Sequence, residues 1–314
     1  MGRQAEMAAA GLCWGQWIAL GAGAAGTGAK RARSIVDPEA LVLLSLYVSQ
    51  EERRLRDMVA WWARVGSTLT SLQRMKTVAK AFPEEITAAS LPLFATLATE
   101  AGDRRWRKAA RGPVPPWVRP GKGPDALDLI DPGALWPRLR AGFGVGAKAD
   151  LLAFLLGLKG GWASTSVIAY ATGYSKVSIR NAASEMTLAR LIRETEGRPS
   201  EYLAPPAPWA ALLDLEGGKP PRSLQTSVPE WRFWVEVFAF LANAMALSRL
   251  STSGAVPSMR LLASRARDLM EDHSTAFRLN NIPVPVPGAF KGPSAMEGLV
   301  ETVRVVTSWS EEYL

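Results

Sequence analysis

Clusters of proline and glycine divide an otherwise helix-rich sequence into separate stretches. They lie at residues 112–124, 204–208, 217–221 and 282–288. Proline removes a backbone donor that a helix needs, and glycine loses much conformational entropy when a helix orders it. Helices therefore have to begin and end between these clusters, and no repeat period joins the stretches into a solenoid.

The small number of cysteine and histidine residues excludes several classes of metal and catalytic site. The 314 residues suffice for two or three domains but include one cysteine, Cys13, and one histidine, His273. A lone cysteine cannot form an intramolecular disulfide or a cysteine-rich metal site, and a lone histidine excludes a multi-histidine metal centre and argues against a histidine-based triad. We expect no metal, no cofactor and no catalytic residue, and hence not an enzyme.

The glycine-rich N-terminus does not change this expectation. Residues 21–26 match a dinucleotide fingerprint letter by letter, but the following acidic residue, Asp37, comes too early. A P-loop also fails, since Ala29 stands where lysine is required. A flexible linker is the favoured interpretation, and a nucleotide-dependent enzyme is the least favoured alternative.

Apolar runs are too short to predict a membrane protein. The longest, 40–48 and 151–158, fall well below the roughly 20 residues of a spanning helix. Gln4, Glu6 and Gln16 interrupt the apolar character of the N-terminal stretch, which therefore lacks a signal-peptide pattern. We expect no membrane contact and a cytoplasmic location, where a single thiol stays reduced.

The clusters and the helical periodicity together predict a mainly α fold. We expect an N-terminal helical domain, a central winged unit with a small β-wing, and a C-terminal helical domain. The predicted segments are a Gly/Ala-rich stretch at 1–36, helices at 37–112, a linker at 113–140, the central unit at 141–204, a linker at 205–228 and helices at 229–314.

Capping residues locate several helices at both ends of the chain. Asp37 followed by Pro38 predicts one helix start, and Ser71 predicts another helix, which runs to Phe82. Further helices are expected at 51–65, 91–98, 103–110, 257–272 and 294–308, with His273 on the surface near a helix end.

The helix expected after residue 229 is apolar on two faces. Trp234 and Phe238 lie on one stripe, and Val237 and Phe240 on another. A helix of this kind is central in a bundle or joins a partner chain. Core burial is favoured over a ligand pocket.

Residues 148–203 contain a dense series of short elements. Gly173 supplies a tight turn between two helices, because glycine adopts left-handed φ values without strain. The expected order is a helix at 149–158, a strand at 162–163, a helix from Ser164 or Thr165 to Ala171, a helix from Ser175 to about Ala189, and two strands at 191–193 and 200–203.

The helix after Gly173 has one apolar face. Ile179, Ala183 and Met186 follow helical spacing and are expected in the core. The residues left facing outward are Lys176, Val177, Ser178, Arg180, Asn181 and Ser184.

This order resembles the winged helix-turn-helix domain of bacterial transcription regulators. The matching residues are Ile168-Ala169, Gly173-Tyr174-Ser175, Ile179 and Leu191-Ile192, and the chain departs from the pattern at Arg190, where such domains often carry glycine. A weaker likeness is to antitoxins of abortive-infection toxin pairs.

The resemblance implies binding to double-stranded DNA by a transcriptional regulator. Arg180 suits guanine or phosphate and Asn181 suits adenine, while Arg198 at the wing tip reaches a phosphate or the minor groove. Serine hydroxyls near the helix start suit phosphate. The expected DNA-binding residues of this unit are Ser175, Lys176, Ser178, Arg180, Asn181, Ser184 and Arg198.

A basic segment adds to this expectation. The chain has a formal net charge of +8, and residues 104–111 gather five cations around Trp106. We expect Arg104, Arg105, Arg107 and Lys108 on DNA phosphates, and Trp106 in the helical core. A merely solvated face is the equally weighted alternative. A similar but weaker cluster is Lys30-Arg31-Ala32-Arg33.

A dimer that contacts two DNA half-sites binds more tightly than a single unit on one half-site, so a homodimer is expected. The alternative function is an antitoxin or adaptor whose C-terminal domain binds a protein partner.

Overall fold

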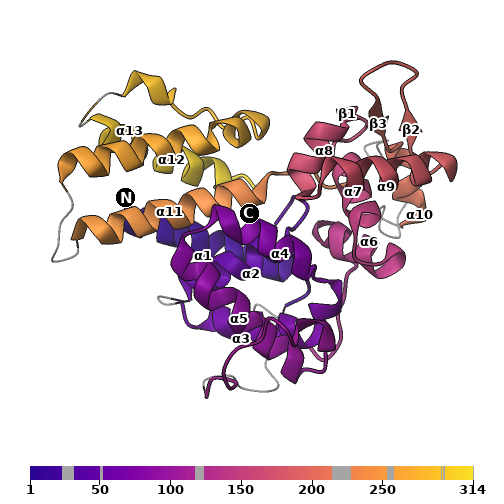
Figure 1. Cartoon of the computed structure of the whole chain (residues 1–314), viewed down its shortest axis with the longest axis horizontal. Helices are drawn as coiled ribbons and strands as arrows, with labels where there is room; N and C mark the ends of the chain where they lie inside the picture. The colour runs from indigo at the N-terminus through magenta and orange to yellow at the C-terminus, as the bar shows by residue number, and fades with distance from the viewer. Residues whose placement is uncertain are drawn as a thin grey trace.

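The computed structural model describes residues 1–22, 32–49, 52–116, 124–213, 228–252, 258–290, 292 and 294–313. These residues form a mainly helical fold with one small antiparallel sheet (Figure 1). Within them, no helix combines the length and the apolar composition that a membrane crossing needs. Several predicted features lie outside the described residues: Lys30 and Arg31 of the weaker basic cluster, most of the 21–26 glycine stretch, and the 217–221 cluster.

One group of helices forms what we call the helical body. Its members share a single hydrophobic core. They are α1 (Gly2–Ala19), α2 (Pro38–Val48), α3 (Arg54–Val65), α4 (Leu72–Val78), α5 (Glu84–Glu100), α11 (Trp234–Thr252), α12 (Met259–Leu279) and α13 (Ser294–Glu311). Short 3-10 turns at Ser67–Leu69, Ala79–Ala81, Arg104–Trp106 and Pro287–Ala289 complete it.

The helical body unites both ends of the chain, whereas the sequence predicts separate N-terminal and C-terminal domains. Helix α1 lies against α11, α13 and α2, so residues 1–19 are a core helix rather than part of a loose N-terminal segment. The physical reason is burial: Leu12, Trp14 and Trp17 of α1 are almost fully covered.

Helix α11 is central in this body. It packs against α1, α12 and α2, and Val237, Phe238 and Phe240 are fully buried. Its two apolar faces are therefore covered within the chain, which confirms the expectation of core burial. These faces do not supply a surface for a partner chain.

Local signals placed several helix ends correctly. The Asp37 carboxylate accepts from the Ala40 N–H at 3.0 Å, and the Ser71 hydroxyl accepts from the Arg74 N–H at 3.1 Å. Two predicted helices have the wrong length: the helix at 91–98 is longer than predicted, and the helix at 103–110 is shorter. Helix α5 continues through Pro92, and the helix expected at 103–110 is only the 3-10 turn Arg104–Trp106.

His273 is not the surface residue that the sequence suggested. It lies within α12, is 5% exposed, and its Nδ1 is 2.8 Å from the Glu236 Oε2 of α11. Packing of α12 on α11 buries this position, because the helix continues to Leu279 rather than ending near residue 272.

The second group of elements, residues 132–213, is here called the winged unit. It has its own core. Its elements are the 3-10 turn Pro132–Ala134, α6 (Leu135–Phe143), α7 (Ala147–Gly157), β1 (Ala163–Ser164), α8 (Thr165–Thr172), α9 (Lys176–Leu188), β2 (Arg193–Glu194), β3 (Glu201–Leu203) and α10 (Pro206–Leu212).

The sheet of the winged unit has the order β1-β3-β2, with both pairings antiparallel. Ala163 faces Tyr202, and Arg193 faces Leu203. The hairpin of β2 and β3 projects from the edge of the molecule (Figure 1). All elements expected within 148–203 are present, with ends shifted by at most two residues.

Both predicted linkers contain helices. Residues 135–143 form α6, in which Leu135, Trp136 and Leu139 are buried in the core of the winged unit. Residues 206–212 form α10, whose Trp209 is 5% exposed. In the second linker Pro206 begins α10, at a position where a missing N–H is tolerated.

Candidate nucleic-acid interface

Helices α8 and α9 form a tight helix-turn-helix pair. Gly173 has φ of 76°, the left-handed conformation expected of it. The Ser175 hydroxyl accepts from the Ser178 N–H at 3.1 Å and so caps α9. The Ser164 hydroxyl caps α8 in the same way. Three local signals in the sequence thus fix the ends of both helices.

Helix α9 buries the face that the sequence predicted. Ile179 and Ala183 are fully covered and Met186 is 2% exposed, where α9 packs on α7 and α8. The opposite face, here called the α9 face, is exposed at Lys176, Val177, Arg180, Asn181 and Ser184. Ser178 is half-buried, and its hydroxyl lies 2.9 Å from that of Ser175.

The α9 face combines two cations, an amide and the Ser184 hydroxyl, and the hydroxyls of Ser175 and Ser178 lie at the positive end of the helix dipole. Such groups suit hydrogen bonding to base edges and phosphates. The helix also carries Glu185, which is held 2.5 Å from Lys148 of α7 in an exposed ion pair. This pairing neutralises an acid that would otherwise repel a polyanion.

The β2–β3 hairpin places Arg198 in an exposed position at its tip. The Thr195 N–H donates to the Glu201 carbonyl at 3.0 Å, which closes the hairpin just inside that tip. Arg190, at the start of the hairpin, has φ of 58°. The backbone conformation that favours glycine is therefore kept, with arginine in it.

The basic segment lies in the helical body rather than in the winged unit. Arg104, Arg107 and Lys108 are exposed there. Trp106 is fully buried against Phe94 with ring centroids 4.9 Å apart, which confirms its expected place in the core. The structure thus divides the predicted DNA contacts between two parts of the molecule.

Arg105 differs from its neighbours. Its guanidinium lies 2.6 Å from the Asp103 carboxylate and donates to the Ser67 carbonyl at 2.8 Å. The hydrogen bond from Arg105 holds the pKa of Asp103 below its usual range. Arg105 therefore secures the turn into the body, and its charge is partly compensated.

Trp117, Arg119 and Lys122, which extend the basic segment in the sequence, lie outside the described residues.

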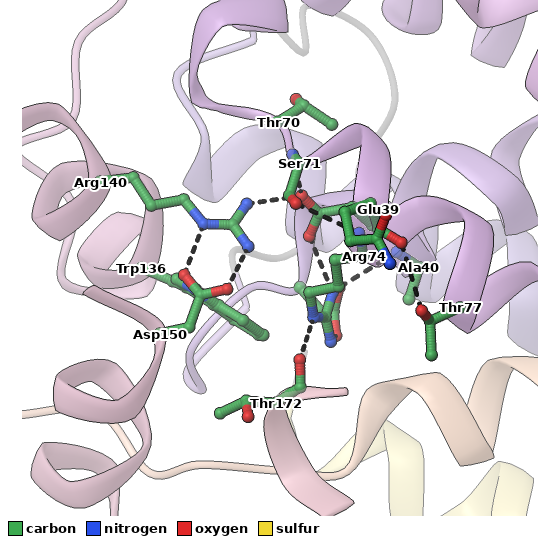
Figure 2. Close-up of polar contacts among 12 residues, drawn as sticks. Glu39, Ala40, Thr70, Ser71, Arg74, Thr77, Trp136, Arg140, Asp150 and Thr172 are labelled. Carbon is green, nitrogen blue, oxygen red and sulfur yellow. Dashed lines mark hydrogen bonds and ion pairs between the residues drawn. The ribbon is translucent and has the colours of Figure 1, made fainter. Parts of the chain in front are cut away.

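A buried network of charges, which no sequence pattern predicts, joins the two units (Figure 2). Arg140 of α6 contacts the Asp150 carboxylate of α7 at 2.7 Å and the Glu39 carboxylate of α2 at 2.5 Å. Arg74 of α4 contacts Glu39 at 2.7 Å and Asp37 at 2.6 Å. All five side chains are at most 4% exposed.

The network is hydrogen-bonded on nearly every side. The Trp136 indole N–H donates to Asp150 at 2.7 Å, and the Ser71 backbone N–H donates to Glu39 at 2.6 Å. The Arg74 guanidinium also lies 4.3 Å from the Trp136 ring centroid. Buried charges persist only when they are paired in this way.

Arg74 connects the network to the helix-turn-helix pair. Its Nε donates to the carbonyl of Thr172 at 2.9 Å, one residue before Gly173 (Figure 2). This carbonyl is among the last of α8 and accepts from a side chain of the helical body. The turn that orients α9 is thus attached to α4.

Burial and pairing shift the pKa values of the network in opposite directions. Burial by itself would raise the pKa of Glu39, but the guanidinium groups of Arg140 and Arg74 outweigh it and lower that pKa. Burial would lower the pKa of Arg74, and the carboxylates of Asp37 and Glu39 raise it instead. Glu39 and Arg74 therefore stay charged at neutral pH.

A second connection joins α8 to the helical body. Burial, together with the nearby Glu236 carboxylate, raises the pKa of Tyr170 on α8. The Tyr170 ring also lies 5.7 Å from the Phe233 ring, just before α11. The sequence predicts neither the charge network nor the Tyr170 contacts. It does contain one relevant signal, which is that polar residues such as Arg140 and Asp150 lie within apolar stretches.

Groups of three or more potential metal ligands are absent from the described residues. Comparison of the chain with family models, with curated proteins and with solved structures found no match.

Proposed function

We propose that this chain binds double-stranded DNA through α9 and acts as a cytoplasmic transcriptional regulator of the winged helix-turn-helix type. The observation that carries the proposal is the division of α9 into a fully buried apolar face and an exposed polar face. An α-helix fits the major groove, and the α9 face supplies the side chains that discriminate base pairs there.

Each predicted contact has a distinct role in this proposal. Arg180 and Asn181 read base edges, while Lys176 and the hydroxyls of Ser175, Ser178 and Ser184 contact phosphates or bases. Arg198 at the hairpin tip contacts an adjacent phosphate or the minor groove. Arg104, Arg107 and Lys108 add phosphate contacts, and a homodimer would present two copies of α9 to two half-sites.

Selection of random duplexes on the purified protein at two salt concentrations tests the proposal. It yields a preferred site, on which the double variant Arg180→Ala, Asn181→Ala is compared with the wild type. We expect the variant to lose roughly 30-fold or more in affinity for that site and to keep its non-specific binding, because each of the two base contacts is worth about 1–3 kcal/mol.

The matched control is Gln73→Ala with Lys76→Ala, which removes an amide and a cation from an exposed face of α4. It should bind like the wild type. A separate variant, with Arg104, Arg107 and Lys108 changed to glutamate, should weaken all sequences alike and flatten the salt dependence. Unchanged affinity and site preference in the α9 variant would refute groove reading.

A further inference from the structure

A second candidate site lies in the helical body rather than in the winged unit. It is a cavity of about 470 Å³ between α11, α12 and the 3-10 turn Ala79–Ala81. Its volume falls within the range of small-molecule sites, which is about 300–1,000 Å³. The polar residues that line it are Lys80, Glu236, Asn243, Arg265, Asp268, Asp272 and His273.

His273 presents one ring nitrogen to this cavity. The side chain is 5% exposed, and its Nδ1 lies 2.8 Å from the Glu236 Oε2. A carboxylate only accepts hydrogen bonds, so Nδ1 carries the proton and the Nε2 of the neutral ring is an acceptor. Among the described residues Nε2 has no hydrogen-bond partner, and it keeps accessible surface. The imidazole is thus an oriented acceptor in the cavity wall.

Asn243 supplies a second oriented acceptor. Its Nδ2 donates to the carbonyls of Ala81 and Ala239, both at 2.9 Å. These two bonds use both amide hydrogens and fix which way the side chain points. The Oδ1 has no donor in the described part of the chain, and it also keeps accessible surface. Two preorganised acceptors at one cavity favour a ligand that donates hydrogen bonds.

Charged side chains of both signs line the same cavity. Lys80, Arg265 and Asp272 are exposed there and form no ion pair with any residue that the structure describes. A purely cationic ligand would be repelled by Lys80 and Arg265, and a purely anionic one by Asp268 and Asp272. A ligand that carries both charges avoids either repulsion.

Leucine side chains complete the wall. Leu247, Leu250 and Leu269 line the cavity, and Leu250 is 38% exposed while Leu269 is half-buried. Their side chains therefore keep apolar surface that a ligand could cover. Burial of that surface favours an aliphatic group on the ligand.

From this arrangement we infer that the cavity binds a free amino acid with an aliphatic side chain. Its ammonium donates to the His273 Nε2, the Asn243 Oδ1 and the Asp272 carboxylate, because an ammonium has three N–H donors and no acceptor. Its carboxylate pairs with Lys80 and Arg265, and its side chain packs on the leucines. The site goes beyond the proposed DNA binding, and its occupancy does not depend on it.

Calorimetric titration of the full chain with L-leucine tests the inference. Isoamylamine, which lacks the carboxylate, and isocaproate, which lacks the ammonium, are the comparison probes. We expect saturable leucine binding that is at least about tenfold tighter than that of either analogue, since each analogue loses one set of charge-assisted bonds. Thermal unfolding should shift upward with leucine concentration, because a ligand of the native state stabilises it.

Two charge reversals test the two ends of the ligand. Asp272→Lys should lose leucine binding, while Glu271→Lys, at the neighbouring exposed position outside the cavity, should retain it. Arg265→Glu should also lose it, with the exposed Arg278→Glu of the same helix as its control. All four positions are exposed, so these chains should fold, which circular dichroism checks.

No saturable leucine binding by the wild type overturns the inference. Equal binding of leucine and either analogue overturns it as well, and so does undiminished leucine binding by Asp272→Lys or Arg265→Glu.

Discussion

At the scale of single residues, Glu39 shows how much of this fold depends on pairing of buried charge. Its side chain is fully buried, yet it lies in contact with both Arg74 and Arg140. Such a pair is weak evidence for net stability over an apolar alternative. Removal of the Glu39 carboxylate leaves each arginine with its aspartate partner, but it deprives the two guanidinium groups of a shared acceptor. The residue thereby specifies how α2, α4 and α6 fit together.

The Glu39→Gln variant should lower the free energy of unfolding by about 1–3 kcal/mol at pH 7, because donors of the two arginines lose a charged acceptor. Because pairing lowers the pKa of Glu39 in the folded state, its stabilisation is present above the ordinary glutamate value, about 4.3, and is lost as pH falls through the lower folded value. The difference between variant and wild type should therefore shrink in acid.

Urea unfolding between pH 7 and pH 3 measures this difference. Glu100→Gln, at an exposed position of α5, is the control and should differ from the wild type by less than about 0.5 kcal/mol. A constant difference between Glu39→Gln and wild type over this range would contradict the linkage.

At the scale of elements, the α8–α9 pair owes its shape to its turn as well as to its helices. Gly173 takes a conformation that other residues adopt with strain, and the preceding carbonyl is held by Arg74. A methyl group at residue 173 would meet only ordinary contacts, with Arg74 Cγ and Thr77 Cγ2 at 3.8 Å. The requirement for glycine is thus conformational rather than steric.

Gly173→Ala should therefore destabilise the protein by about 1–2 kcal/mol, the cost of a left-handed backbone for an L-residue. Gly142→Ala in α6 is the matched control, because nothing lies within 4 Å of the added methyl and the helical backbone tolerates it. It should be neutral or stabilising by up to about 1 kcal/mol. Chemical denaturation measures the free energy of unfolding of both variants. Equal changes in this free energy for Gly173→Ala and Gly142→Ala would contradict a requirement for the left-handed turn conformation at residue 173.

At the scale of the whole molecule, two hydrophobic cores are joined by the buried charge network and by residues 228–233. In that segment, the Trp231 N–H donates to the Gly157 carbonyl, and the Glu230 carbonyl accepts from the Ile35 N–H, both at 3.0 Å. Two adjacent residues, Glu230 and Trp231, are thus hydrogen-bonded to residues more than 70 positions away in the sequence. The helical body depends on the same long-range closure, since α1 covers α11.

A separately produced fragment of residues 228–314 should fail to fold as a monomer. Without α1 and α2, the fully buried Val237, Phe238 and Phe240 lose part of their cover. Circular dichroism during thermal unfolding and gel filtration measure the outcome, with the full chain as reference. A monomeric fragment with a cooperative unfolding transition would contradict a shared core.

The local architecture was predictable from the sequence. The caps at Asp37, Ser71 and Ser175, the turn at Gly173 and the buried face of α9 all depend on side chains within about four residues of one another. Such interactions are encoded by spacing, so the predicted elements of 148–203 were found with small shifts. The DNA contacts assigned to the α9 face remain predictions.

Only the tertiary structure decided which elements share a core and how charges are paired. Arg74 and Arg140 look like surface residues in the sequence, and nothing near them identifies Glu39 or the Thr172 carbonyl as a partner. Desolvation makes each of these groups costly when alone and acceptable only in a completed network. That network forms when α2, α4, α6, α7 and the end of α8 pack together, which local spacing does not specify.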